Sequence, residues 1–442
     1  MDQKNIGSAI HLFGQRLAQL GGLSRVGQKL RVLLTNSSLA GRTGSELYIL
    51  DVARELLRTG HQPVCYSPIL GDVAEEMNQA AIPVTDQLPS IQVSPDVIHG
   101  QHHLETLAAL LYFPGVPAVQ YCHGWSPWEE APVEFPRIRQ FIAIDHVGKE
   151  RLTTRHGIDE SKIVILPNFF DDRRFLMRKR PLRAKPLRAL VFSNAFDARA
   201  APVRDACRRY GIALDVIGIG SANIHPKPEL VLPEYDIVFA RGRAAIEAMA
   251  CGAAVICCGP QGVGPLITPR NFERLRDLNF GMRTVVGPCD ADAIAEQIAL
   301  YHPQEAAEVS ANVRVASTLN AAVSRLMGYY RQAIESNQAS IPEEEGRAVS
   351  IYLREWSPRY KGWAEKSRQV EHLAPANREL QFRADRLEAE LADAQRQLAE
   401  VRNSLSWRIP QAMLNWRPMQ RVADYALNGL AKWRRWTTKY SS

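Results

Sequence analysis

A glycine and a glutamate five residues apart form the part of this sequence best suited to chemistry. They lie in the stretch DIVFARGRAAIEAMACGAAVI, residues 236–256. Gly242 lets the backbone approach a ligand closely, and the free N–H groups of Arg243 and Ala244 open a helix whose dipole favours a diphosphate. Glu247 follows about one turn later, where a carboxylate is placed to accept hydrogen bonds from a ribose diol. The alternative for Glu247 is a structural ion pair with a nearby arginine.

A second set of candidates follows the apolar run PAVQYC. His123 ends a predicted strand, which places it either beside a ligand or in the core. Trp125 and Trp128 come next, where their rings are placed to stack on a ligand, with Glu129 or Glu130 accepting hydrogen bonds from its hydroxyls. An ordinary aromatic loop is the alternative, because tryptophan is largely buried on average.

The histidines before this run do not predict a metal site. His99, His102, His103 and Glu105 crowd one strand end in the stretch HGQHHLE, and no partner cluster accompanies them. Protein zinc sites draw three or four ligands into a defined geometry, which residues crowded at one strand end do not supply. We therefore expect no bound metal.

Two series of alternating strands and helices carry these residues. The first begins with the apolar run LRVLLT, after which Leu47, Leu50, Ala53 and Leu56 keep helical spacing as far as Gly60. Further strand-like runs read QPVCYSPI, DVIHGQHH, PAVQYCHG, QFIAID and KIVILPN. Strands that alternate with helices predict a parallel, doubly wound sheet.

The second series has strand-like runs ALVFSN, ALDVIGIG, YDIVFA, AAVICCG and RTVVG, with helices predicted over 290–301 and 321–334. Two tandem Rossmann-like α/β domains would bind a ligand at the carboxyl ends of their strands. We divide the chain into a lead-in, an N-terminal domain, a basic linker, a C-terminal domain, an irregular linker, a coiled coil and a tail. Their residues are 1–29, 30–170, 171–188, 189–335, 336–375, 376–405 and 406–442.

The positive charge of the chain is concentrated in two segments. The formal net charge is +7, residues 173–188 hold eight Lys or Arg and no acid, and residues 406–442 hold seven against one Asp. The rest of the chain is net acidic, which argues against a nucleic-acid-binding body and for local anionic partners. No apolar run approaches the roughly 18 residues of a membrane span.

The C-terminal segments predict association. From Leu380, apolar residues occupy both heptad core positions over nearly four heptads, which predicts a homo-oligomer or a partner helix through 380–405; a lone packed helix is the alternative. The tail 406–442 holds four of the eight tryptophans among Lys and Arg. This composition favours an anionic membrane surface over nucleic acid, and we expect no nucleic acid as a partner.

The stretch around Gly242 resembles the nucleotide-sugar signature of glycosyltransferases with the GT-B fold, especially the retaining enzymes of family four. In that family a Gly lies five residues before a Glu, which AMACG and a strand then follow; Gly242, Glu247 and residues 248–252 match. VQYCHGW, KIVILPNFFDDRRF and TVVGPCDADAIAEQIALY are also similar to parts of the family. The resemblance covers about residues 30–335.

The resemblance implies a cleft that binds a nucleotide-diphosphate sugar as a substrate, with no cofactor and no metal. Glu247 would bind the donor's ribose, and the backbone after Gly242 would bind its diphosphate. Gly41 and Gly44, in the first glycine loop, would approach the transferred sugar and the phosphate. His123 would lie beside the donor sugar. The ligand of Trp125 and Trp128, with Glu129 or Glu130, would then be an acceptor sugar.

Two features of the family have no counterpart at the expected place. The retaining enzymes usually carry a second Glu eight residues before the first, and this position holds Phe239. The family's Arg and Lys pair is not evident after the first strands of the C-terminal domain. Arg199, Arg241 and Arg243 are therefore the candidates for meeting the diphosphate charge, and the stereochemistry stays open.

These features predict a cytoplasmic glycosyltransferase, peripheral on the inner face of the membrane. It would move a sugar, as a hexosyltransferase, from a nucleotide-diphosphate donor to a saccharide or lipid-linked acceptor in surface polysaccharide biosynthesis. Positioning and stabilisation of the leaving diphosphate would supply most of the catalysis, with His123 and Glu247 as the catalytic candidates. The alternatives are a nucleotide-sugar epimerase on the same fold and a catalytically degenerate scaffold acting through its coiled coil.

Overall fold

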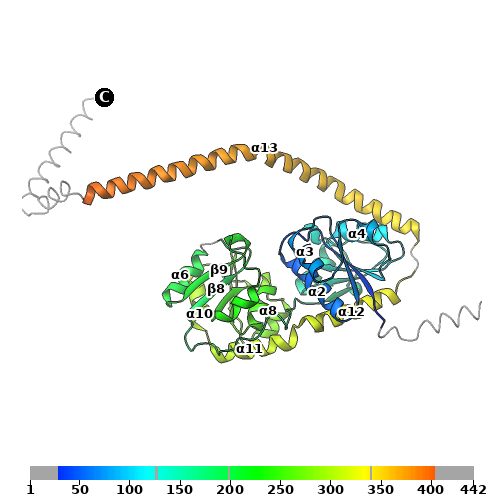
Figure 1. Ribbon diagram of the computed structural model, residues 1–442, viewed down its shortest axis with the longest axis horizontal. Helices are drawn as coiled ribbons and strands as arrows, with labels where there is room; N and C mark the ends of the chain where they lie inside the picture. Colours follow the sequence, from blue (N-terminus) through cyan, green and yellow to red (C-terminus); the bar gives the residue numbers. More distant parts are fainter. Residues whose placement is uncertain (1–27, 125–127, 198–199, 339–340, 404–442) are drawn as a thin grey trace, which may run out of the picture. The chain divides into compact units, whose positions relative to one another are not determined.

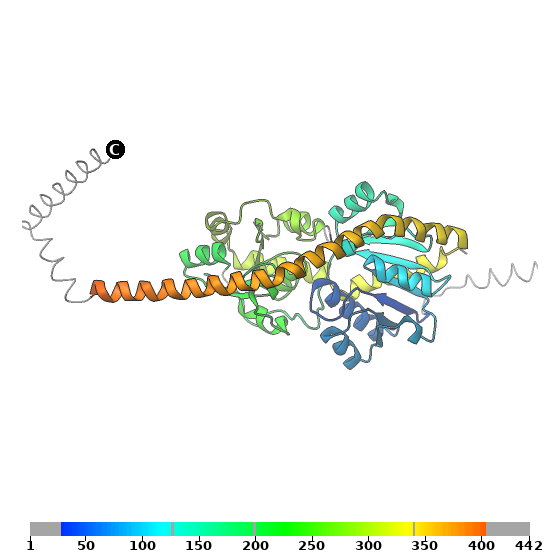
Figure 2. The ribbon, with the colours of Figure 1, turned by 90° about the horizontal axis from the view of Figure 1, so that it is seen from above.

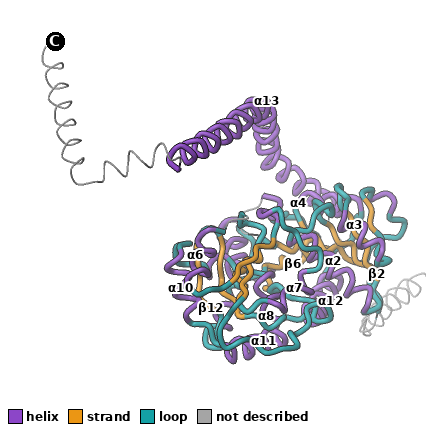
Figure 3. Tube along the Cα trace, turned by 60° about the vertical axis from the view of Figure 1, so that its left-hand side comes forward, coloured by secondary structure: helices purple, strands orange, loops and turns teal. Residues whose placement is uncertain are grey.

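The structure is a computed structural model that describes residues 28–124, 128–197, 200–338 and 341–403. It divides into two compact units, of which the first ends at Tyr352 and the second begins at Leu353. The first unit holds two α/β domains, each built on its own sheet. Figure 3 shows the strands as orange layers with purple helices around them. The tandem α/β organisation predicted from the sequence is confirmed.

Seven parallel strands form the first sheet, in the order β3-β2-β1-β4-β5-β6-β7. The strands are β1 Arg31–Thr35, β2 Gln62–Tyr66, β3 Val84–Thr85, β4 Val97–Gln101, β5 Ala118–Cys122, β6 Ile138–Ala143 and β7 Ile163–Ile165. Strands β4 and β5 are buried along their whole length. Burial on both faces explains why these strands read as nearly continuous apolar runs.

The helices of the first domain follow the predicted spacing. They are α2 Gly44–Arg58, α3 Asp72–Gln79, α4 His103–Tyr112 and α5 His146–Glu150, with short helices at Leu88–Ser90, Trp128–Glu130, Arg151–Arg155 and Glu160–Lys162. Helix α2 begins at a capping box, in which the Thr43 backbone N–H donates to Glu46 Oε2 at 2.6 Å. Its apolar stripe packs against β1 in the core, which fixes the N-terminal end of the helix beside the glycine loop.

Five strands form the second sheet, in the order β12-β11-β10-β8-β9. The strands are β8 Arg188–Phe192, β9 Ala213–Ile217, β10 Ile237–Ala240, β11 Ala254–Gly259 and β12 Gly262–Leu266. Its helices are α6 Ala201–Arg209, α7 Pro228–Val231, α8 Arg243–Ala250, α9 Phe272–Asp277, α10 Ala291–Ala299 and α11 Pro303–Ala316, with short helices at Ile219–Ser221, Leu232–Glu234 and Met282–Thr284. All of its strands are parallel except β12, which runs antiparallel to β11.

The last strand of the second sheet is not the one that the sequence predicts. The run RTVVG, residues 283–287, starts in the short helix Met282–Thr284, and Gly287 forms an isolated bridge to Val263. The edge position belongs to β12 instead. A Cβ at Gly264 would lie 2.1 Å from the carbonyl oxygen of Thr284, so the glycine permits this close approach. The pattern missed β12 because its Gly and Pro residues are those that mark turns.

Helix α12, Leu319–Glu335, packs on the first sheet rather than on the second. Leu326 and Tyr330 belong to the core that α2 and β1 form, and the Tyr330 hydroxyl lies 2.8 Å from His99 Nδ1. Figure 1 shows α12 beside the blue helix α2. The sequence placed this helix in the C-terminal domain by its position, because an apolar stripe does not reveal which sheet it covers.

Helix α13, Pro342–Asn403, runs through most of the predicted irregular linker 336–375 and is 62 residues long. Figure 2 shows it as one ribbon from yellow to orange. Pro358 and Pro375 lie inside it and favour a break, but the strong helix formers around them, Glu, Arg and Ala, continue the helix. The predicted tail 406–442 and residues 1–27 of the lead-in lie outside the described residues. Among the helices that the structure describes, none combines the length and apolarity of a membrane span.

Candidate functional site

A pocket opens between the two α/β domains, where the N-terminal ends of α2 and α8 face each other. Its volume is about 170 Å³. The first domain contributes Arg42, Thr43, Gly44 and Leu47; the connecting segment contributes Arg174 and Phe175; the second domain contributes residues that include Ser193, Asn194, Gly218, His225, Arg243, Ala244 and Glu247. Ser193 and Gly218 directly follow β8 and β9, so the pocket lies at the carboxyl ends of the strands, as expected for this class of sheet.

Gly242 forms the turn from β10 into α8. Its φ of 58° and ψ of −134° belong to a region that side chains disfavour, although an added Cβ would meet nothing within 4 Å. Its N–H donates to the carbonyl oxygen of Phe280 at 2.7 Å, which fixes the turn. The next two residues, Arg243 and Ala244, line the pocket and begin a helix whose first N–H groups have no partner within the helix.

Glu247 is buried, at 6% exposure, and its carboxylate lines the same pocket. Arg243 Nε donates to Glu247 Oε1 at 2.7 Å. Burial raises the pKa of Glu247, and the charge of Arg243 opposes this rise. The ion pair that we weighed as an alternative is therefore present, at a residue that also lines the pocket.

Asp51 links this pair to the other domain, and the sequence did not single it out. It lies on α2 at 1% exposure and accepts hydrogen bonds from Arg243 Nη2 and from Arg174 Nη1, the latter at 3.2 Å. Desolvation lowers the pKa of Arg243, but Asp51 and Glu247 raise it by more, so the guanidinium stays charged. The available signal was an acidic residue among the apolar positions of an amphipathic helix.

His123 lies just after β5 in a tightly packed polar group. Its ring nitrogen Nε2 contacts the Gln101 side-chain amide, its backbone N–H donates to Glu130 Oε2 at 2.7 Å, and its ring meets the Tyr48 ring at 4.6 Å between centroids. Desolvation lowers the pKa of His123 to about 4; Glu130 opposes this, and Arg243 adds to it. The imidazole is therefore neutral near pH 7 and lies within electrostatic range of the pocket arginine.

The acceptor candidates separate into exposed and buried residues. Trp128 is 37% exposed and Glu129 is half-buried, both in the short helix Trp128–Glu130. Glu130 is buried instead, and its carboxylate lies 3.6 Å from His102 Nε2, so it contacts the interior of the protein and not the solvent. Trp125 lies outside the described residues. Trp128 and Glu129 remain the candidates available to an acceptor.

Two of the histidines that we weighed as metal ligands contact tyrosine hydroxyls instead. His99 and His103 hydrogen-bond the hydroxyls of Tyr330 and Tyr352, at 2.8 and 2.7 Å. Within the described ranges, no group of three or more His, Cys, Asp or Glu side chains is placed to hold a metal ion.

The remaining donor-site candidates occupy different places. Gly44 lines the pocket, whereas Gly41 lies earlier in the loop and is not a lining residue. A Cβ added at Gly41 would lie 3.5 Å from Glu46 Oε1. Arg241 turns toward Met282, with 2.6 Å between Nη1 and Sδ, and is not a lining residue. Arg199 lies outside the described residues.

Phe239 shows why no acid lies eight residues before Glu247. Its side chain is fully buried in β10 and belongs to the apolar core of the second domain. A carboxylate there would be desolvated without a partner. The position is therefore part of the fold and not of the pocket.

The basic segment 171–188 meets the protein's own acids. Arg173 pairs with Glu55 and Asp171, Arg174 with Asp51 and Glu229, Arg178 and Arg183 with Asp236, and Arg188 with Asp215 and Glu234. The charge run thus neutralises carboxylates of both domains. The sequence showed the run but not its partners, most of which lie far away in the chain.

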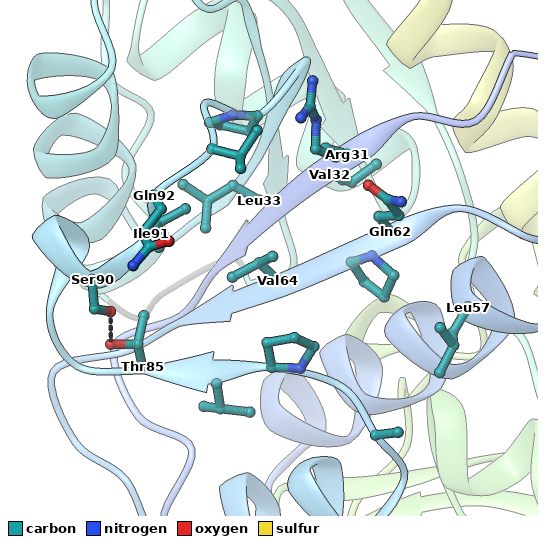
Figure 4. A pocket seen from close by; sticks show the side chains of 16 residues that line it. Arg31, Val32, Leu33, Leu57, Gln62, Val64, Thr85, Ser90, Ile91 and Gln92 are labelled. Atoms are coloured by element: carbon teal, nitrogen blue, oxygen red, sulfur yellow. Dashed lines mark hydrogen bonds between the residues drawn. The ribbon is translucent and has the colours of Figure 1, made fainter.

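A larger pocket, of about 570 Å³, lies elsewhere on the first domain. Figure 4 shows Arg31, Gln62 and Val64 from β1 and β2 around it, together with Thr85 from β3 and Ile91 from the segment that follows. None of the predicted site residues lines this pocket. Its lining is mainly apolar and includes the first residues of β1 and β2.

Comparison with known proteins agrees with this fold. Residues 42–174 match a family model described as Glycosyltransferase Family 4. A glycosyltransferase structure from Rickettsia africae is similar at 16% identity and a TM-score of 0.53, covering 70% of this chain and 100% of that one. Anabaena HepE in complex with UDP and glucose is similar at 14% identity and a TM-score of 0.52, covering 69% and 100%. No curated protein sequence matches the chain.

Proposed function

Because the chain has the GT-B fold and resembles the family 4 glycosyltransferases through residues 42–174, we propose that it transfers a sugar from a nucleotide diphosphate to an acceptor hydroxyl. One observation carries this proposal. The start of α8, the Glu247 carboxylate and the glycine loop before α2 border one pocket between the two domains. Such a pocket offers amide donors to phosphates and a carboxylate to a ribose diol.

The proposed chemistry divides between the two domains. The bond between the sugar's anomeric carbon and the diphosphate breaks, a bond to the acceptor oxygen forms, and the acceptor proton is released. The helix N–H groups and nearby arginines stabilise the charge that grows on the leaving diphosphate. Neutral His123 is suited to a hydrogen bond with the transferred sugar. Trp128 and Glu129 face the acceptor, a saccharide or lipid-linked saccharide in surface polysaccharide assembly.

A panel of nucleotides tests the function. We expect a nucleoside diphosphate, with UDP as the first probe because HepE binds it, to raise the melting temperature of the full chain. At 100 times the dissociation constant, ligand binding adds about 2.7 kcal/mol to the stability. The matching nucleotide sugar should release its diphosphate only when an acceptor saccharide is added.

Two other results would identify the alternatives. Isomerisation of the donor sugar without an acceptor would identify an epimerase. If no nucleoside diphosphate changes the melting temperature at millimolar concentration, the chain is not a nucleotide-sugar enzyme and the scaffold alternative holds.

We also propose that the C-terminal part of the chain associates with itself and with an anionic membrane surface. Four leucines on α13 support self-association, because Leu380, Leu387, Leu391 and Leu398 are 59–64% exposed in the single chain. Their heptad spacing is that of a coiled-coil seam. The Trp and Lys/Arg composition of 406–442 supports a location on the cytoplasmic face of the membrane.

Two truncations separate these roles. A chain that ends at Pro375 should be monomeric in light scattering and should not sediment with anionic vesicles. A chain that ends at Leu405 should keep self-association and lose vesicle binding, because it keeps the heptads and lacks the tail. Equal sedimentation of all three chains would show that the tail is not the anchor.

A further inference from the structure

Arg174 lies where the chain passes between the two domains. The outgoing and returning connections are bonded to each other here, because the Phe170 N–H donates to the Ser317 carbonyl at 3.0 Å and the Leu319 N–H donates to the Phe170 carbonyl at 2.9 Å. Arg174 follows four residues later, and its side chain, 23% exposed, lines the pocket. Its guanidinium is therefore held at the domain junction and borders the space beside α8.

The guanidinium of Arg174 bridges the two domains. Nη1 lies 3.2 Å from Asp51 Oδ1 on α2, and Nη2 lies 3.2 Å from Glu229 Oε2 on α7. A guanidinium carries five N–H donors, so one contact on each terminal nitrogen leaves donors for a further anion. The side chain of Asp51 is 1% exposed and that of Glu229 is 13% exposed. Water can therefore hydrate the Glu229 carboxylate more readily than the Asp51 carboxylate once Arg174 has left it.

The other lining arginines are held more closely. Arg243 binds both Glu247, at 2.7 Å, and Asp51. Arg42 lies 2.5 Å from Glu76, a residue that also pairs with Arg54. Both contacts of Arg174 are longer than these. Among the arginines that line the pocket, Arg174 therefore loses the least interaction energy when it leaves one carboxylate for a phosphate.

A diphosphate entering this pocket meets nearly balanced charge. Arg174 and Arg243 already face the carboxylates of Asp51, Glu229 and Glu247. Because both arginines are already paired, one of them must leave a carboxylate before it can neutralise a phosphate. Arginine suits this role, since its planar guanidinium can donate two hydrogen bonds to phosphate oxygens.

We propose that Arg174 binds the donor diphosphate and gives up Glu229 when it does so, while Asp51 keeps its place. This inference rests on the proposed nucleotide-sugar function and extends it. The cation for the leaving group then comes from the segment that connects the domains. The contact is assigned to the β-phosphate, which a nucleoside monophosphate lacks, so Arg174 selects diphosphates over monophosphates.

Isothermal titration of the full chain with UDP and with UMP tests this role. Arg174→Gln should weaken UDP binding by about 10- to 100-fold, the loss expected for a hydrogen bond to a charged group, and should change UMP binding much less. Arg173→Gln is the matched control. Arg173 neighbours Arg174 in the sequence, but it pairs with Glu55 and Asp171 and does not line the pocket. Both affinities should therefore stay near those of the unchanged chain.

A second variant works in the opposite direction and tests the exchange even if Arg174→Gln does not fold. Glu229→Gln removes the carboxylate that competes for Arg174, so UDP should bind more tightly and UMP should bind as before. Unchanged or weaker UDP binding by Glu229→Gln overturns the proposed exchange.

The two proposals fail in different ways. If the unchanged chain binds UDP and Arg174→Gln binds it equally well, or loses UDP and UMP by the same factor, the role of Arg174 is overturned and the proposed function stands. If the unchanged chain binds none of the nucleoside diphosphates in the panel, the proposed function fails, and the inference fails with it.

Discussion

Replacing Glu247 with glutamine is expected to weaken nucleoside-diphosphate binding by about 10- to 100-fold, because a neutral amide replaces a charged acceptor of the ribose hydroxyls. The carboxylate is buried and lines the pocket, and one of its oxygens accepts from Arg243 Nε. Titration calorimetry of both proteins with UDP measures the change.

The ligand provides the decisive control for Glu247. The unchanged chain should bind 2′,3′-dideoxy-UDP more weakly than UDP, whereas Glu247→Gln should bind the two nearly equally. Glu234→Gln serves as the matched variant, since Glu234 is a 57%-exposed glutamate of the same domain that pairs with Arg188. If Glu247→Gln still discriminates between the two ligands as the unchanged chain does, Glu247 does not hold the diol.

Replacing Arg243 with methionine is expected to lower the free energy of unfolding by about 3–5 kcal/mol at pH 7, the cost of leaving buried charges without their partner. The variant keeps the aliphatic stem and leaves Asp51 and Glu247 without their shared cation. Urea unfolding measures the loss. Arg188→Met is the control, because Arg188 is 39% exposed and its two ion pairs are at the surface, so its loss should stay below about 1 kcal/mol.

The deficit of Arg243→Met should shrink as the pH falls from 7 to 5. Burial already raises the pKa of Glu247, and loss of the arginine raises it further. A carboxyl whose pKa is higher in the folded state than in the unfolded state binds more protons when folded. The folded state therefore gains stability as the pH falls through that raised pKa. An equal deficit at both pH values would show that the buried carboxylates are not its cause.

Local patterns predicted the elements that carry the site. The spacing of Leu50, Ala53 and Leu56 predicted helix α2, and apolar runs predicted most of the strands, because burial of one face repeats with the period of the element. The turn at Gly242 and the place of Glu247 one turn into α8 are also local, since both depend on residues within a few positions. The turn and the carboxylate that we propose to bind the phosphates and the ribose could therefore be predicted from one short stretch.

Local sequence patterns were enough to predict the α/β class, the two domains and the signature from Gly242 to Gly252. The pairing of the charges depends on the folded chain: Asp51 lies 192 residues from Arg243 and 123 from Arg174, yet it contacts both. The same holds for α12, whose apolar stripe fits either sheet by its pattern and covers the first one. Periodicity reports that a side chain is buried, but the partner that neutralises its charge or fills its groove is chosen by how distant elements pack.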